Sequence, residues 1–195
     1  LAVPQNTLGA ELRQLENKQW EQITLPHTPF VEPLTVLHQW QGICYYKKKI
    51  TITPEEAKKH IWIEFEGAMH LADVWINGKH VMQHAGGYTP FVVDATGLLK
   101  TGKENELLVR LDNRNNSLIP PGKPLETLDF CYYGGIYRNV HLIAKADVHI
   151  THPILDGHPA GAGIFITYPK VSQELSVVDA KTEIKNTSDK EKVVE

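Results

Sequence analysis

The sequence predicts an all-β protein in which two sheets pack face to face as a sandwich. Many short segments alternate between apolar and polar residues, turn residues separate these segments, and no stretch has the apolar period of a long amphipathic helix. Several segments have one polar face, which is expected of strands that cover a core from one side only. A closed single barrel fits this pattern less well.

Strands are expected in the first part of the chain over residues 21–28, 43–53, 61–66, 72–76, 79–83, 91–94, 106–111 and 136–144. In the strand over 61–66, apolar residues occupy one face, and Trp62, Glu64 and Glu66 occupy the opposite, polar face. Asn77-Gly78 between two of these strands is a strong signal for a tight hairpin.

The sequence changes character around Lys145-Ala146-Asp147, because nearly all aromatic residues precede this point. Three more strands are expected, over residues 148–151, 164–168 and 176–184. Three strands cannot bury both faces of a sandwich. We therefore expect residues 145–195 to be the truncated start of a second β-domain; the alternative is an appendage that completes the first.

The composition is that of a globular protein, with 42% hydrophobic and 22% charged residues. A net charge of -3 gives no indication of nucleic acid or an anionic membrane as partner. No apolar run is long enough to span a bilayer. The chain begins with Leu1 and shows no signal-peptide pattern, so we expect it to be processed or excised.

Cys44 and Cys131 lack the spacing of metal ligands. We expect buried free thiols, because cysteine packs well as a small hydrophobe. One long-range disulfide between them is the alternative.

The stretch from Leu128 to Val140 combines a carboxylate, Asp129, with several aromatic rings and the pair Gly134-Gly135. Adjacent glycines permit backbone angles that a side chain would forbid, and they let another segment come close. The stretch therefore predicts a corner or bulge at the rim of a sheet, a surface suited to a polyhydroxylated ligand. Taken alone, it fits a tight turn packed by aromatic rings better.

Five short segments follow one another in a characteristic order: LPHT at 25–28, FEGA at 65–68, ADVWING at 72–78, HAGGYTPF at 84–91, and the stretch 129–140. No single segment is specific, but the ordered series over residues 20 to 144 resembles the N-terminal sugar-binding domain of glycoside hydrolase family 2. That family includes β-galactosidases, β-glucuronidases and β-mannosidases, and the β-galactosidase-like branch is the most similar.

The resemblance implies a jelly-roll (galactose-binding-domain-like) β-sandwich over residues 1–144, followed by the truncated start of an immunoglobulin-like β-sandwich over 145–195. A (β/α)8 barrel would follow and hold the two catalytic glutamates of a retaining mechanism. The sequence contains no Asn-Glu-Pro motif of the family's acid/base type. We therefore expect no catalytic residue, no cofactor and no metal in this chain, although its parent protein would be a hydrolase.

The resemblance also implies site residues. Asp129 matches the position from which relatives send a carboxylate into the barrel's pocket, where it accepts hydrogen bonds from sugar hydroxyls; the alternative is a carboxylate that caps local amides. Asn113 and Asn115 would lie near Asp129 and line the cleft. Tyr133 could stack on a sugar, or pack the corner as we expect of Tyr132.

Other polar and aromatic residues favour structural interpretations. Glu64 and Glu66 are expected to be solvated or paired with lysines of the next strand. The histidines, including His80 with His84 and His149, His152 and His158, lack ligand spacing and are expected to be scattered. Arg138 is expected to form an ion pair with Glu66 or Asp73. Trp62 and Trp75 are expected to be covered by the barrel, and so exposed in this chain alone.

Three functions follow as hypotheses: the N-terminal domain of a family 2 β-glycosidase, a free-standing carbohydrate-binding module, or a structural β-sandwich. The first implies two partners, a β-galactoside-like carbohydrate and the protein's own C-terminal barrel. The sequence leaves the cleaved glycoside, a homo-oligomeric state and the compartment open, with a periplasmic or exported bacterial enzyme as one option.

Overall fold

The computed structural model describes residues 15, 18–30, 39–130, 132–157 and 162–194. In this part of the chain the regular structure is antiparallel strand with short 3₁₀ turns, and no α-helix forms. The predicted all-β class is confirmed. Among the same residues, no helix has the length and apolarity that crossing a membrane requires.

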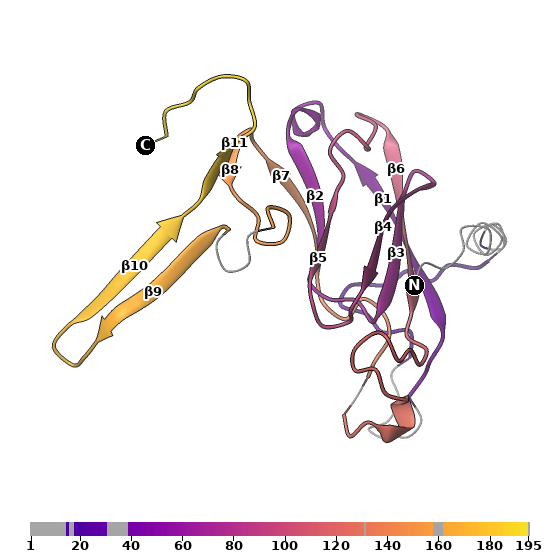
Figure 1. Ribbon diagram of the computed structural model, residues 1–195. Helices are drawn as coiled ribbons and strands as arrows, with labels where there is room; N and C mark the ends of the chain where they lie inside the picture. The colour runs from indigo at the N-terminus through magenta and orange to yellow at the C-terminus, as the bar shows by residue number, and fades with distance from the viewer. Residues whose placement is uncertain (1–14, 16–17, 31–38, 131, 158–161, 195) are drawn as a thin grey trace.

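Two sheets make up the main body of the molecule (Figure 1). The larger sheet has the order β1-β6-β3-β4 and consists of β1 (Ile43–Thr51), β6 (Glu104–Asp112), β3 (Leu71–Ile76) and β4 (Lys79–Ala85). The smaller sheet has the order β5-β2-β7 and consists of β5 (Phe91–Asp94), β2 (His60–Phe65) and β7 (Val140–Lys145). The 3₁₀ turns η3 (Glu56–Lys58) and η4 (Leu125–Thr127) lie in connections between strands.

The hydrophobic core lies between these two sheets, and it is built from every second residue of the strands, as the alternation predicts. The main contributors are Ile61, Ile63 and Phe65 from β2, Phe91 and Val93 from β5, Ala72, Val74 and Ile76 from β3, and Leu107, Val109 and Leu111 from β6. Asn77 and Gly78 both have positive φ, 51° and 78°, so the predicted hairpin turn between β3 and β4 is confirmed.

The prediction that Trp62 and Trp75 are exposed in this chain is wrong. Trp62 is 5% exposed, because the rings of His149 and His152 pack edge-on against it at 5.3 and 5.5 Å. Trp75 is 4% exposed and packs in a small cluster that includes Leu15. Segments distant in sequence therefore cover the outer faces of both sheets.

Two strand predictions differ from the structure near the corner. Residues 21–28 form no strand; Pro26 lacks an N–H, and the segment instead lies along the corner, where the His27 N–H donates to the Ile136 carbonyl at 2.7 Å. The strand predicted over 136–144 begins only at Val140. Before it, Asn139 exchanges bonds with Glu66, whose N–H donates to the Asn139 carbonyl and whose carboxylate accepts from the Asn139 amide.

The last part of the chain forms two small sheets, β8 (Val148–Ile150) with β11 (Ile184–Asn186), and β9 (Ile164–Val171) with β10 (Ser176–Thr182). The strand predicted over 176–184 is thus two strands. They separate at Glu183, whose N–H donates to the Gly163 carbonyl and whose carbonyl accepts from the Thr151 N–H.

The β9–β10 hairpin projects away from the two-sheet body in Figure 1. It leaves many apolar side chains exposed, among them Ile164, Ile166, Tyr168, Val171 and Val178. By contrast, β8 and β11 adjoin the main body, where His60 bonds to the Thr187 hydroxyl at 2.7 Å and His152 approaches Glu64 at 3.7 Å.

Candidate functional site

The candidate site is the corner, which we define as Leu128–Phe130 and Tyr132–Tyr137. Leu128 and Tyr132 are buried in one apolar cluster with Met69 and Leu125. Asp129 and Phe130, which lie between these two anchors, are exposed. The backbone is therefore held on both sides of an outward-facing carboxylate.

Asp129 has no hydrogen-bond or ion-pair partner within the residues that the structure describes. A carboxylate that stabilises a turn would accept bonds from nearby backbone amides, as Asp112 does from the Arg114 N–H at 3.1 Å. The geometry thus argues against a local capping role for Asp129. It leaves the two carboxylate oxygens available as acceptors for an outside group.

Tyr132 is fixed through both its backbone and its side chain. Its N–H donates to Oε1 of Gln39, and its hydroxyl bonds to Nδ1 of His70. The ring packs in the cluster with Leu128, so the prediction that Tyr132 packs the corner is confirmed. Tyr133, the other predicted ring, is half-buried.

His70 links this cluster to the sheets. It is 2% exposed, its N–H donates to the Asp112 carbonyl at 3.3 Å, and its carbonyl accepts from the Gly86 N–H at 2.9 Å. Burial lowers the pKa of His70 and raises that of Tyr132, so both side chains are neutral near pH 7. The bond between them is a neutral hydrogen bond inside an apolar surrounding.

Asn113 does not reach the surface as a ligand contact would require. It is 1% exposed; its Oδ1 accepts from the Gly42 N–H at 2.7 Å, and its Nδ2 donates to the Trp40 carbonyl at 2.9 Å. Asn113 therefore acts as a bracket that ties residues 40–42 to the end of β6. Its neighbour Asn115 accepts from Gln41 and from the Leu125 N–H, and so positions η4.

The two glycines of the corner allow the close approach that the sequence predicts. A Cβ on Gly134 would lie 2.7 Å from Nδ2 of Asn113. Gly135 has φ of +97°, and a Cβ there would lie 2.5 Å from the Tyr46 hydroxyl and 2.6 Å from the His27 carbonyl oxygen. Both contacts are too short for a side chain, so glycine is required at both positions.

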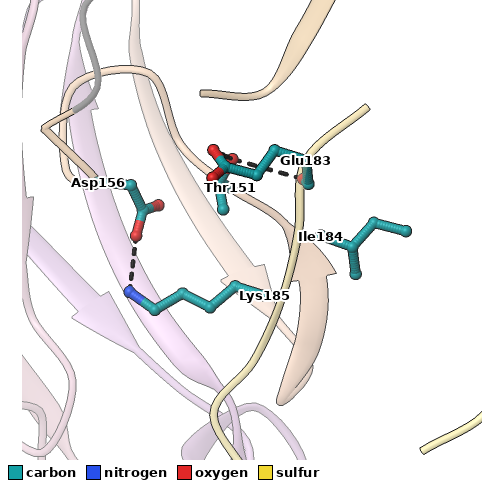
Figure 2. A pocket seen from close by; sticks show the side chains of 5 residues that line it. All are labelled: Thr151, Asp156, Glu183, Ile184 and Lys185. Carbon is teal, nitrogen blue, oxygen red and sulfur yellow. Dashed lines mark hydrogen bonds and ion pairs between the residues drawn. The ribbon is translucent and has the colours of Figure 1, made fainter. Parts of the chain in front are cut away.

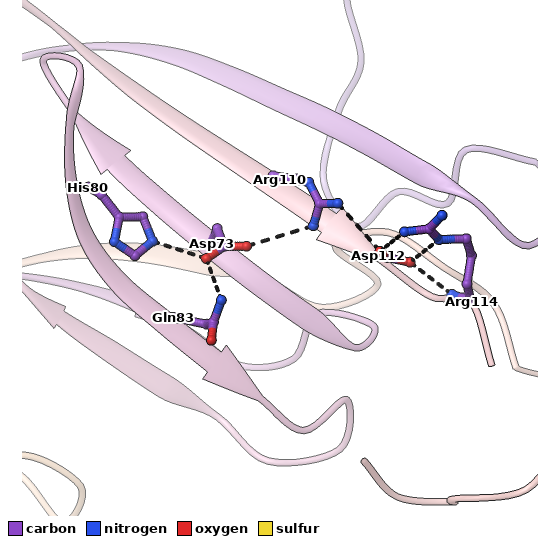
Figure 3. Close-up of polar contacts among 6 residues, drawn as sticks. All are labelled: Asp73, His80, Gln83, Arg110, Asp112 and Arg114. Carbon is purple, nitrogen blue, oxygen red and sulfur yellow. Dashed lines mark hydrogen bonds and ion pairs between the residues drawn. The ribbon is translucent and has the colours of Figure 1, made fainter. Parts of the chain in front are cut away.

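An ion-pair ladder crosses the outer face of the larger sheet and ends just beyond β6, at Arg114 (Figure 3). His80 and Gln83 contact Asp73 at 3.0 and 2.8 Å, and Asp73 faces Arg110 at 3.7 Å. Arg110 in turn lies 3.4 Å from Asp112.

Arg114 completes the ladder beyond the end of β6, with its Nη2 2.6 Å from Oδ2 of Asp112. Burial alone would raise the pKa of Asp112, but the hydrogen bonds and charge of Arg114, together with Arg110, outweigh burial and lower it. Asp112 is thus a charged residue whose carboxylate is fully engaged within the ladder.

Two expected ion pairs do not form, although Glu64 and Glu66 are partly solvated, as the other half of that prediction has it, with 25% and 38% of their side chains exposed. Glu64 and Glu66 pair with histidines rather than lysines: Glu64 with His152 at 3.7 Å, and Glu66 with His141 at 3.1 Å. Arg138 pairs with neither Glu66 nor Asp73 and lies over the ring of Tyr137, 6.0 Å from its centroid. The register of β2 with β7 places His141 directly opposite Glu64 and close to Glu66, which accounts for the pairing of His141 with Glu66.

Among the described residues, no group of three or more His, Cys, Asp and Glu side chains lies close enough together to hold a metal ion. His80 contacts Asp73, and His84 stacks on Phe91 at 4.5 Å. His149 and His152 pack against Trp62. His158 lies outside the described residues.

An open hollow of about 330 Å³ lies in the last part of the chain, lined by Thr151, Asp156, Glu183, Ile184 and Lys185 (Figure 2). Its polar groups bind one another: Lys185 contacts Asp156 at 2.6 Å, and Thr151 donates to Glu183 at 3.0 Å. These pairs tie β8 to β11, which favours a structural role for the hollow.

Cys44 is a free, half-buried thiol, whereas Cys131 lies outside the described residues. Burial raises the pKa of Cys44 to about 12 and raises that of its neighbour Tyr46 as well. Cys44 therefore stays protonated at neutral pH and packs against the core, as expected of a structural thiol.

Sequence reasoning missed Gln39 and His70, the two residues that hold Tyr132. Gln39 lies in a loop without a pattern, and His70 directly precedes a strand that is buried throughout. The one available signal was a histidine next to an apolar run, which is not specific.

Comparison with known proteins places these features in a family. The family model described as glycosyl hydrolases family 2, sugar binding domain, matches residues 12–146. A β-glucuronidase of Formosa agariphila is 33% identical over 86% of this chain and 18% of its own length. A β-galactosidase of Thermoanaerobacter pseudethanolicus is 33% identical over 95% of this chain and 26% of its own length.

The crystal structure of a Bacteroides uniformis β-glucuronidase is similar with a TM-score of 0.70 and 32% identity, over 87% of this chain and 19% of that one. The chain thus spans about a fifth to a quarter of the length of these relatives.

The close approach at the corner predicts unequal costs for two glycine substitutions. Gly135→Ala should destabilise the chain by at least about 2 kcal/mol more than Gly97→Ala, which should itself cost about 1 kcal/mol. Both positions have positive φ, but a Cβ on Gly97 would meet nothing within 4 Å. Urea unfolding of the two variants measures the difference, and equal midpoints would contradict the packing described for Gly135.

Stability should fall above pH 9. Burial raises the pKa of Cys44, Tyr46 and Tyr132 above their ordinary values of 9.0, 10.0 and 10.0, so the folded chain retains protons that the unfolded chain releases. Their contribution is fully present below pH 9 and is lost as pH rises, at up to about 1.4 kcal/mol per pH unit for each group. Urea midpoints across this range test the trend.

Matched variants assign the alkaline loss to these groups. Tyr132→Phe and Tyr46→Phe should each flatten the decline, whereas Tyr168→Phe, which alters an exposed ring on β9, should leave it unchanged. If the urea midpoint of the unmodified chain does not change above pH 9, these groups lose their protons over the same pH range in the folded and the unfolded chain, and the prediction is wrong.

Proposed function

The chain belongs to the sugar-binding-domain family of the family 2 glycosyl hydrolases, and from this premise we propose that it lends a carboxylate, Asp129, to the sugar site of a β-glycosidase. It corresponds to the N-terminal domain of its β-glucuronidase and β-galactosidase relatives. The observation that carries the proposal is the state of Asp129, which is exposed, unpartnered among the described residues, and held between two buried anchors.

A carboxylate is suited to this role because a charged acceptor makes stronger hydrogen bonds than a neutral one. Sugar hydroxyls are donors that a pair of carboxylate oxygens can accept together. Tyr133, which is half-buried on the same corner, is the second proposed contact. The proposed part of Asn113 is indirect, since its burial leaves it to hold the corner rather than the ligand.

We assign residues 1–144 to a jelly-roll domain and residues 145–195 to the start of an immunoglobulin-like domain. The exposed apolar side chains of β9 and β10 support this division, because a two-stranded hairpin is rarely stable without further strands or a covering surface. A (β/α)8 barrel, supported by this domain, would supply the catalytic groups of the complete protein.

This chain alone is proposed to be catalytically silent. A retaining glycosidase needs two carboxyl groups about 5 Å apart on either side of the scissile bond. Glu64 on β2 and Glu66 just after its end already bind histidines, so they do not form such a pair. Hydrolysis with retention of configuration is then a property of the complete protein, with no cofactor and no metal supplied by this domain.

Replacing Asp129 tests the proposed role directly. In the complete protein, Asp129→Ala should lower kcat/KM for p-nitrophenyl β-galactoside or β-glucuronide by about 100-fold or more, because several charge-assisted hydrogen bonds are lost together. Asp189→Ala removes another exposed aspartate, in the last part of the chain, and should leave the kinetics unchanged. Unaltered kinetics for Asp129→Ala would remove the assignment.

Calorimetric titration separates this function from its alternatives. The isolated chain should show no binding of galactose, glucuronic acid or oligosaccharides, since one carboxylate without the barrel cannot enclose a sugar. Dissociation constants in the millimolar range or below would instead favour a free-standing carbohydrate-binding module. If the chain binds no sugar and the Asp129→Ala variant has normal activity, the remaining hypothesis is a structural β-sandwich.

A further inference from the structure

We propose that Gln39 and His70 are positioning residues that aim Asp129 by fixing Tyr132. This inference rests on the proposed role of Asp129. It adds two residues, from segments far apart in the sequence, whose effect on a bound sugar would pass through the corner rather than through direct contact.

The first step is the geometry of the corner itself. The backbone that carries Asp129 enters from Leu128 and leaves toward Tyr132, and both side chains are buried in the cluster with Met69 and Leu125. Asp129 and the adjacent Phe130 are exposed, and they lie between two fixed points that are four positions apart in the sequence. A displacement of either point moves the carboxylate, because the segment between them is too short to absorb it.

The second step is that one of these points depends on two separate hydrogen bonds. Oε1 of Gln39 accepts the backbone N–H of Tyr132, and Nδ1 of His70 bonds to its hydroxyl. Gln39 and His70 are 8% and 2% exposed, so water does not compete for these bonds as it would at the surface. The amide Nε2 of Gln39 is buried without a partner among the described residues, so the bond to Tyr132 is what orients this side chain.

The third step is that His70 is tied to the main body of the fold. Its backbone bonds join the end of β6, through the Asp112 carbonyl, to the loop after β4, through the Gly86 N–H. The adjacent Met69 N–H donates to the Gly135 carbonyl at 2.9 Å. The position of Asp129 is thus set by the two-sheet body and not by the flexibility of its own loop.

A double-mutant cycle in the complete protein tests the inference. Tyr132→Phe removes the hydroxyl and keeps the ring, and it should lower kcat/KM by about tenfold through misplacement of the carboxylate. In the Asp129→Ala background the same substitution should have no further effect, because there is no carboxylate left to aim. If the loss of kcat/KM in the double variant equals the product of the losses in the two single variants, the inference is overturned.

A matched control uses the same chemistry elsewhere. Thr187→Val also breaks a hydroxyl–histidine bond, in this case to His60 at 2.7 Å, and His60 pairs with Lys145 at the end of β2 that lies away from the corner. Whatever this variant costs should be retained in full in the Asp129→Ala background. A control that lowers kcat/KM on its own but not in the Asp129→Ala background would mean that the cycle reports a general loss of folding or activity, and it would contradict the inference.

A second variant keeps the test decisive if Tyr132→Phe folds poorly. Gln39→Met has a similar length but no acceptor, so it frees the backbone N–H of Tyr132 and leaves the bond to His70 in place. It should give the same non-additive pattern with Asp129→Ala. Normal activity of Asp129→Ala would remove the proposed function itself, whereas a large loss with additive cycles would remove only the positioning role.

Discussion

A buried guanidinium group imposes the constraint on which the rest of this structure depends. Arg110 is 1% exposed in the outer face of the larger sheet, and leaving such a charge without a counter-ion costs about 3–5 kcal/mol. Asp73 on β3 and Asp112 at the end of β6 provide the compensating charges. This pairing favours one register of β3 against β6, and it places Asp112 where its carbonyl receives the His70 N–H. Hydrogen bonds of His70 to Asp112 and to Tyr132 therefore link the sheet to the corner.

The sequence carries most of the information about the two-sheet body, because burial on one face of a strand leaves a period of two. Ile61, Ile63 and Phe65 show that period, and all three lie in the core. The same logic failed for Trp62 and Trp75, since alternation cannot reveal that a distant segment covers the other face. It also failed at residues 136–139, where bonds to loop and side-chain groups replaced a ladder that the apolar pattern alone predicts.

The candidate site was harder to predict than the fold, because its residues are assembled by contacts between loops. The resemblance to a family drew attention to Asp129, because the stretch from Leu128 to Val140 taken alone fits a tight turn packed by aromatic rings better. Asn113 was identified for the wrong reason: proximity suggested a ligand contact, whereas both polar atoms of its side chain hold residues 40–42. Gln39 and His70 left no recognisable pattern, because a single buried hydrogen bond has no periodicity.

The indole of Trp62 makes the two-sheet body depend on residues that follow the proposed domain boundary at residue 145. Among the described residues, none beyond β7 belongs to the inter-sheet core, so a polypeptide ending at Lys145 would retain every described member of that core. Yet the rings that shield Trp62 belong to His149 and His152, on the far side of that boundary. Division there would turn a buried aromatic side chain into a sticky surface patch, and a shortened version of this protein would have to carry a substitution at that position to remain monodisperse.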